Sequence, residues 1–164
     1  MKSKKHNAFT LIELMVTLAL VGILATIALP GMSNFIKNER LTTSINSLLS
    51  YLQYARSEAI LRHSQITVCA SNDQATCSGN WVDGWIVTVT NADDSVTILK
   101  IRQALRGNVT LSSSGGTEVI FDRRGFSPAS ESIFAVCDDR GISNLKSISI
   151  SKTGRVRNGG GSAC

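Results

Sequence analysis

The residues best suited to bind a ligand lie near the C-terminus, in the segment Gly154-Arg155-Val156-Arg157. If this segment is extended, both guanidinium groups point to one side, about two residue rises or roughly 6.6 Å apart. This spacing is close to the phosphate repeat of a nucleic-acid strand, and arginine makes charge-assisted, bidentate hydrogen bonds to phosphate. Lys146 and Lys152 lie nearby, and residues 140–164 contain no acid, whereas earlier segments such as Asp122-Arg123-Arg124 mix signs. The alternative is a solvated hairpin end whose charge only keeps the protein soluble.

Catalytic chemistry is hard to assemble from the remaining residues. Beyond residue 8 the only histidine is His63, and the paired acids Asp93-Asp94 and Asp138-Asp139 are typical of turns. The sequence has no phosphate-binding loop, nucleophile elbow or zinc-protease motif. We therefore expect a protein that is not an enzyme and that uses no cofactor and no metal ion.

The four cysteines, Cys69, Cys77, Cys137 and Cys164, are even in number and form no C-x-x-C pair. Such a pattern favours disulfides in an oxidising compartment. Of the three possible pairings we favour Cys69 with Cys77, closing a loop over Ser71–Ser78, and Cys137 with Cys164, which would tie down the glycine-rich end. A metal site made of all four cysteines is the alternative.

An apolar segment at residues 9–29 contains a single charged residue, Glu13. As a helix it is about 30 Å long, enough to cross the hydrocarbon core of a bilayer. The lysines among the first five residues stay in the cytoplasm by the positive-inside rule, so the rest of the chain is sent outward. A cleaved secretory signal is the alternative, but its best cleavage site, Thr26-Ile27-Ala28, is weak.

Glu13 is unusual for a membrane span, because a carboxylate there costs on the order of a few kcal/mol. Its presence predicts a function and a cationic partner. The alternative is a lone acidic residue in a signal anchor.

The segment Lys4-Lys5-His6-Asn7-Ala8 followed by Phe9-Thr10-Leu11-Ile12-Glu13-Leu14 resembles the class III signal of type IV pilins and pseudopilins. The resemblance implies that a prepilin peptidase removes residues 1–8, cutting between Ala8 and Phe9, and methylates Phe9; the family usually has glycine in place of Ala8. It also implies that Glu13 pairs with the amine of Phe9 on a neighbouring subunit. The protein would then lie in the bacterial inner membrane, with one span and its N-terminus inside, until it joins other pilin subunits in an extracellular pilus.

Periodicity predicts the elements that position these residues. Pro30-Gly31 should kink or loosen the helix rather than end it. Apolar residues then recur at spacings of three and four up to Arg62: Leu41, Ile45, Leu48, Leu52, Ala55 and Ala59. After His63-Ser64 the period changes to two, and we expect strands at Gln65–Ala70, Gly84–Thr90, Val96–Arg102, Val109–Leu111, Thr117–Phe121, Ile133–Asp138 and Ser147–Ser151.

Length and composition fit one such domain. The chain has 164 residues, is 43% hydrophobic and 18% charged, and carries a formal charge of +5. We therefore predict an α+β protein, in which a long N-terminal transmembrane and amphipathic helix packs on one or two antiparallel sheets, the pilin fold. Residues 30–164 form a single globular domain, with a helix half at 30–62 and a β-rich part at 65–164.

The pilin-like start, the helix before the strands, the Phe121-Asp122-Arg123-Arg124-Gly125 turn and the late G-R-x-R together resemble the FimT/GspH group of minor pilins. In the FimT branch a C-terminal G-R-x-R segment is associated with DNA binding in natural transformation. The resemblance implies that Gly154, Arg155 and Arg157, helped by Lys152 and Lys146, bind double-stranded DNA. We expect contacts to the backbone that are indifferent to sequence, because no Trp or Tyr beside the segment offers base stacking. The alternative is a structural minor pilin, or a GspH-like pseudopilin of type II secretion, that acts in filament assembly without binding DNA.

Overall fold

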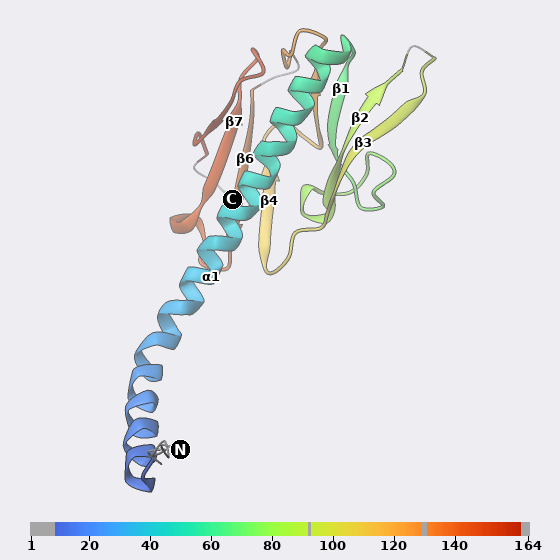
Figure 1. Ribbon diagram of the computed structural model, residues 1–164. Coiled ribbons are helices and arrows are strands. Elements are labelled where there is room, and N and C mark those ends of the chain that lie inside the picture. The colour runs from blue at the N-terminus through green and yellow to red at the C-terminus, as the bar shows by residue number, and fades with distance from the viewer. Residues whose placement is uncertain (1–8, 92, 129–130, 162–164) are drawn as a thin grey trace, which may run out of the picture. The chain divides into compact units, whose positions relative to one another are not determined.

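The computed structural model describes residues 9–91, 93–128 and 131–161 (Figure 1). It contains one long helix, α1 (Leu11–Arg62), followed by eight strands. The helix continues through Pro30-Gly31 and does not end there, in agreement with the prediction. The chain divides into two compact units between Lys37 and Asn38.

The first unit consists of the apolar part of α1. Thr10 begins the helix, because its hydroxyl accepts a hydrogen bond from the backbone N–H of Glu13 at 3.3 Å. Large apolar side chains are exposed all round this segment, including Leu11, Ile12 and Leu24. A helix that is apolar on every side suits lipid or a protein core better than water.

A test of length and apolarity finds no single helix among the described residues that could cross a membrane. Two consecutive segments, residues 11–26 and 31–62, could do so together by length and composition.

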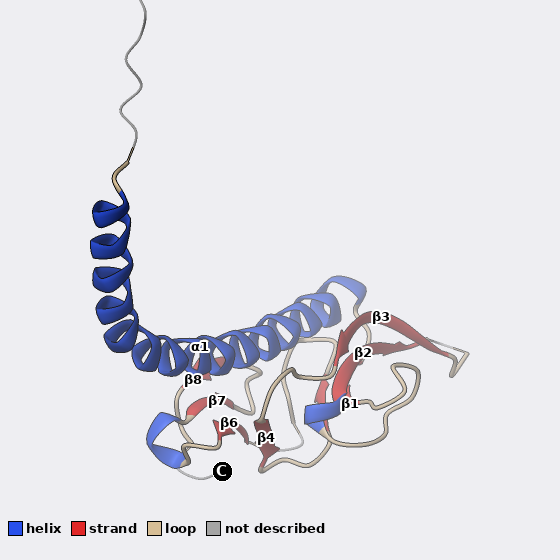
Figure 2. Ribbon diagram, turned by 90° about the horizontal axis from the view of Figure 1, so that it is seen from below, coloured by secondary structure: helices blue, strands red, loops and turns tan. Residues whose placement is uncertain are grey.

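The second unit begins with the amphipathic part of α1. All six residues of the predicted apolar stripe, from Leu41 to Ala59, are buried, and none is more than 5% exposed. This part of the helix lies across strands of both sheets (Figure 2). The stripe is therefore the face that the helix buries against the β-rich part, as its periodicity predicted.

The strands form two antiparallel sheets. The first has the order β3-β2-β1-β5, and the second has the order β4-β6-β7-β8. The bounds are β1 (Ile66–Ala70), β2 (Gly84–Thr90), β3 (Val96–Gln103), β4 (Val109–Ser113), β5 (Glu118–Phe121), β6 (Ser132–Asp138), β7 (Lys146–Ile150) and β8 (Val156–Asn158). Short 3-10 helices stand at Trp81–Asp83 and Ile142–Asn144. The predicted α+β fold is confirmed, with two sheets, and the seven expected strands lie within two residues of their predicted bounds.

One hydrophobic core joins α1 to both sheets. Its largest fully buried side chains are Trp85, Phe121 and Phe134. Trp81 contacts Phe134 edge-on, with 4.9 Å between ring centroids, and its indole N–H donates to the carbonyl of Gly116 at 2.8 Å. Each such side chain contributes on the order of 2 kcal/mol by burial alone. The edge strand β8 packs against this core through the partly buried Val156.

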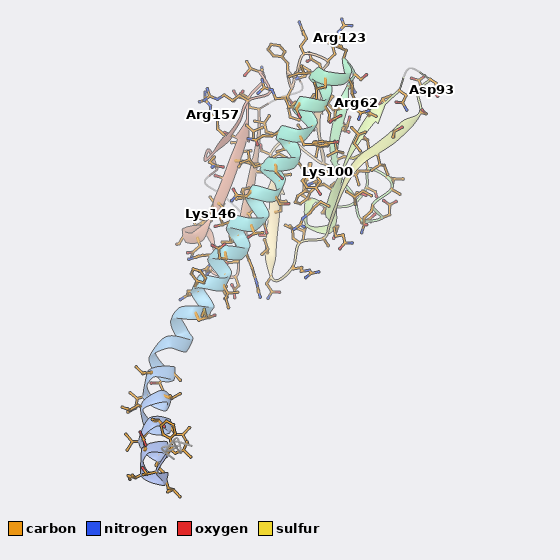
Figure 3. All side chains as sticks on the ribbon, viewed as in Figure 1. Arg62, Asp93, Lys100, Arg123, Lys146 and Arg157 are labelled. Carbon is orange, nitrogen blue, oxygen red and sulfur yellow. A yellow bond between two sulfur atoms is a disulfide. The ribbon has the colours of Figure 1, made fainter. Side chains whose placement is uncertain are left out.

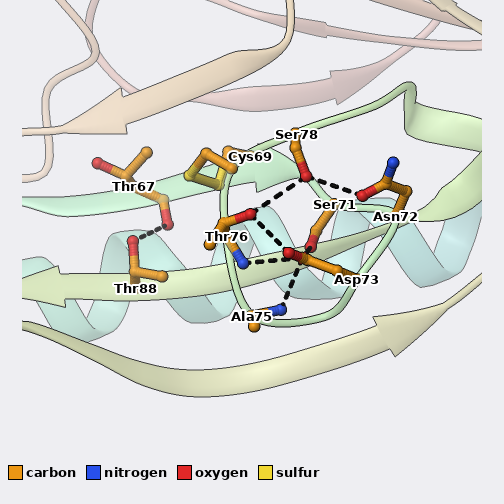
Figure 4. The surroundings of a disulfide bond; sticks show 10 residues. Thr67, Cys69, Ser71, Asn72, Asp73, Ala75, Thr76, Ser78 and Thr88 are labelled. Atoms are coloured by element: carbon orange, nitrogen blue, oxygen red, sulfur yellow. Dashed lines mark hydrogen bonds between the residues drawn. A yellow bond between two sulfur atoms is a disulfide. The ribbon is translucent and has the colours of Figure 1, made fainter.

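Cys69 and Cys77 form a disulfide, the pair expected for them from the sequence (Figure 4). The loop that it closes is ordered around Asp73, whose carboxylate accepts hydrogen bonds from Ser71, Ala75 and Thr76. The bonds from Thr76 are the main cause of a pKa of Asp73 well below its usual range. The disulfide and the hydrogen bonds to the Asp73 carboxylate therefore both hold this small loop together.

Cys164 lies outside the described residues, and so does the expected bond to Cys137. The chain leading toward it lies along β7, where Gly159 donates its N–H to the carbonyl of Ser147 at 2.7 Å. The Gly161 N–H then donates to the Ser147 hydroxyl at 3.1 Å.

Candidate nucleic-acid interface

The β7–β8 hairpin carries the predicted phosphate-binding segment. Its turn is closed by the N–H of Gly154, which donates to the carbonyl of Ser151 at 2.8 Å, and by the N–H of Ser151, which donates to the carbonyl of Arg155 at 3.0 Å. Gly154 has a φ of +73°, the left-handed conformation that this kind of turn requires after its central residues. The glycine therefore shapes the turn that precedes the two arginines.

The register of the hairpin fixes where the two arginines point. Val156 pairs with the buried Ile150, whereas Arg157 pairs with Ser149 on the opposite face of the sheet. Arg155 and Arg157 are both exposed, and neither makes an ion pair with any residue that the structure describes. Because β8 is the last strand of its sheet, the two guanidinium groups stand at a free edge.

A second turn, at residues 122–127, follows β5. The Asp122 carboxylate accepts the backbone N–H groups of Arg124 at 2.8 Å and Phe126 at 2.9 Å. It also pairs with the Arg124 guanidinium at 3.3 Å. Burial alone would raise the pKa of Asp122, but the hydrogen bonds from Phe126 and Arg124 outweigh it and hold the pKa below its usual value. The turn is thus built around an ionised acid.

Arg56 of α1 ties the two turns together. Its Nε donates to the carbonyl of Gly125 at 3.1 Å, and its Nη2 donates to the carbonyl of Thr153 at 3.2 Å. The N–H of Ser127 donates to the carbonyl of Lys152 at 3.0 Å, which joins the turns directly. The turn that carries the exposed residues Arg123 and Arg124 therefore lies beside the turn that carries Lys152 and Arg155.

The two lysines of the predicted site, Lys146 and Lys152, lie toward opposite ends of β7. Lys152 is exposed within the hairpin turn, but Lys146 begins β7, six residues and thus about 20 Å away along the strand. Figure 3 shows Lys146 and Arg157 well apart. Lys146 instead lines a cavity of about 460 Å³ with Thr42, Asn46 and Asn158. In the register of the hairpin, Arg157 pairs with Ser149, three residues or about 10 Å along β7 from Lys146. The grouping of Lys146 with the arginines stays a prediction.

Sequence reasoning missed Arg56 and the second turn as parts of this surface. Arg56 contacts residues 69 and 97 positions away, which no local spacing reveals. The Phe121-Asp122-Arg123-Arg124-Gly125 turn was expected as a turn of the family, but its arginines were not assigned to the site. We call Arg123, Arg124, Lys152, Arg155 and Arg157 the cationic edge. Arg140 is excluded because its side chain is only 18% exposed where it pairs with Asp138, whereas the Arg124 side chain is 73% exposed.

Two family descriptions match the chain. The family "Type II transport protein GspH" matches residues 44–154, and the "Prokaryotic N-terminal methylation motif" matches residues 3–29. A curated fimbrial protein of Pseudomonas aeruginosa is 38% identical over 68 residues, which are 42% of this chain and 44% of that protein. The chain therefore spans less than half the length of the curated relative that it matches.

Solved structures agree in fold. The type IV minor pilin FimU of Pseudomonas aeruginosa is similar with a TM-score of 0.64 and 25% identity, over 77% of this chain and 92% of that chain. The minor pseudopilin EpsH of the type 2 secretion system of Vibrio cholerae is similar with a TM-score of 0.57 and 13% identity, over 73% of this chain and 95% of that chain. The second likeness is one of fold alone.

Proposed function

Because the chain belongs to the GspH family and carries the N-terminal methylation motif, within the FimT/GspH group of minor pilins, we propose that it is a minor type IV pilin that binds extracellular DNA. The binding takes place through the cationic edge and is indifferent to base sequence. It serves the uptake of double-stranded DNA in natural transformation.

The observation that carries this proposal is the imbalance of charge at the cationic edge. Arg155, directly before the edge strand β8, and Arg157 within it are exposed and make no ion pair among the described residues. The one acid of the two turns, Asp122, is already bound to Arg124. A surface with several unneutralised cations attracts the phosphate backbone, and such contacts carry no sequence information.

A second candidate is a purely structural subunit, either a minor pilin that acts in pilus assembly or a pseudopilin of type II secretion. The likeness in fold to both FimU and EpsH favours it. On this account the exposed arginines contact other subunits. DNA binding discriminates the two candidates, because only the first requires it.

The N-terminal unit has the same role in both candidates. We propose that prepilin peptidase cuts before Phe9, that the apolar part of α1 holds the protein in the bacterial inner membrane, and that Glu13 later pairs with a neighbouring subunit in the filament. Glu13 is exposed on the helix, so a second chain can reach it; Ala8 lies outside the described residues. N-terminal sequencing of the processed protein should begin at Phe9, whereas a start near Leu29 would contradict this account.

Electrophoretic mobility shift of the full chain in a nonionic detergent tests the function. We expect similar, modest affinity for duplexes of unrelated sequence, and loss of most binding in the double variant Arg155→Gln, Arg157→Gln. Arg106→Gln is the matched control, because Arg106 is exposed and its neighbour Gly107 packs on Arg40. Arg40 lies about 24 Å before Arg56 along α1, so Arg106 is distant from the turns that Arg56 contacts. Equal binding by the wild type and the double variant would favour the structural candidate.

A further inference from the structure

An aromatic side chain lies next to the cationic edge. Phe126 is 41% exposed, and its neighbour Ser127 is joined by a backbone hydrogen bond to Lys152 of the hairpin turn. The Arg124 guanidinium lies over the Phe126 ring, with 5.2 Å from its central carbon to the ring centroid. A stacking surface is therefore present beside the segment Gly154-Arg155-Val156-Arg157, on a turn distant in sequence.

The Arg124–Phe126 pair is held in place before any ligand arrives. Arg124 is bound to Asp122 through Nε at 3.4 Å and Nη2 at 3.3 Å. Asp122 also receives the backbone N–H of Phe126 at 2.9 Å, so one carboxylate fixes both members. The Arg124 side chain is nonetheless 73% exposed. A planar cation with an open side, backed by an aromatic ring, can accept a nucleobase by stacking.

We propose that the Arg124–Phe126 pair stacks an unpaired base of DNA whose phosphates lie on the hairpin arginines, and that the protein therefore prefers DNA with a single-stranded end to blunt duplex. This inference rests on the proposed DNA binding. Bases inside a duplex are covered by their neighbours, so they cannot reach the pair without unpairing. An overhang offers free bases at no such cost, and stacking is tolerant of base identity.

The test compares a blunt duplex with the same duplex carrying a single-stranded overhang, by fluorescence anisotropy with the full chain in nonionic detergent. The wild type should bind the overhang substrate about fivefold or more tightly, the lower end of what stacking one base contributes. Phe126→Leu should lower overhang affinity to that for blunt duplex and leave blunt-duplex affinity unchanged. Phe126→Tyr keeps the ring and should keep the preference.

A second variant guards against a folding defect. Arg124→Lys retains the charge but loses the planar group, so it should lower the ratio of overhang affinity to blunt-duplex affinity. Only that ratio is compared, because Arg124 belongs to the cationic edge and its substitution also alters blunt-duplex binding. Equal affinity of the wild type for both substrates would overturn the stacking inference and leave the proposed function standing. Failure to bind either DNA would overturn both. Pilus assembly defects in Phe126→Leu with unchanged overhang binding would assign Phe126 to a subunit contact instead.

Discussion

Gly154 lies directly against the backbone of Gly125: a Cβ atom at position 154 would stand 1.9 Å from the Gly125 carbonyl oxygen. The same oxygen accepts a hydrogen bond from Arg56. The glycine of the Gly154-Arg155-Val156-Arg157 segment is therefore needed where the two turns meet.

Gly154→Ala should destabilise the domain by about 2 to 4 kcal/mol, because it adds a clash with backbone to the cost of the left-handed conformation. Gly116→Ala is the control for conformation alone, since Gly116 has a φ of +88° and no atom within 4 Å of the added methyl group. The control should cost about 1 to 2 kcal/mol. Urea unfolding measures both, and equal losses would show that the contact with Gly125 is unimportant.

The carboxylate of Asp122 should make stability depend on pH. Its pKa in the folded protein is lowered, so its stabilisation is present above the unfolded pKa of about 3.9 and is lost as the pH falls through the folded value. Below about pH 4 the wild type should therefore lose more stability than Asp122→Asn. Unfolding midpoints at pH 6 and pH 3 test this, and parallel pH curves for the two proteins would contradict it.

Glu13 is expected to act between subunits. Glu13→Ala should leave the second unit folded, because residues 38–164 contain their own core, yet it should impair incorporation into the filament. Circular dichroism of the purified variant measures its folding, and immunoblotting of sheared pili measures its incorporation. Normal incorporation of the variant would remove this role from Glu13.

The proposed bond between Cys137 and Cys164 would close a loop of about 28 residues and stabilise the domain by about 3 to 4 kcal/mol. Reduction should lower the melting temperature and weaken DNA binding, since the loop contains Arg155 and Arg157. Cys69→Ser with Cys77→Ser, which leaves this bond intact, should spare DNA binding. Peptide mapping by mass spectrometry that finds free thiols at these positions in the oxidised protein would contradict the pairing.

Local sequence patterns predicted the helix and most strands, whereas contacts between residues distant in sequence determine where the site residues lie. The apolar stripe from Leu41 to Ala59 and the period of two in the strands could be predicted because each pattern repeats every few residues. Both are confirmed. The last strand, β8, was not among the expected strands, because three residues give too short an alternation. The link between Arg56 and the two turns, and the place of Phe126 beside Lys152, depend on how α1 and both sheets pack. No spacing in the chain encodes them.

The salt dependence of DNA binding tests the central claim most directly. Each phosphate contact contributes about −0.9 to the slope of log K against log salt. Of the five cations of the cationic edge, Arg124 is already paired with Asp122, so the other four should give a slope near −3 to −4. Arg155→Gln with Arg157→Gln should flatten the slope by about 2, while Arg106→Gln leaves it unchanged. Wild-type slope and affinity in the double variant would contradict DNA binding through the β7–β8 hairpin.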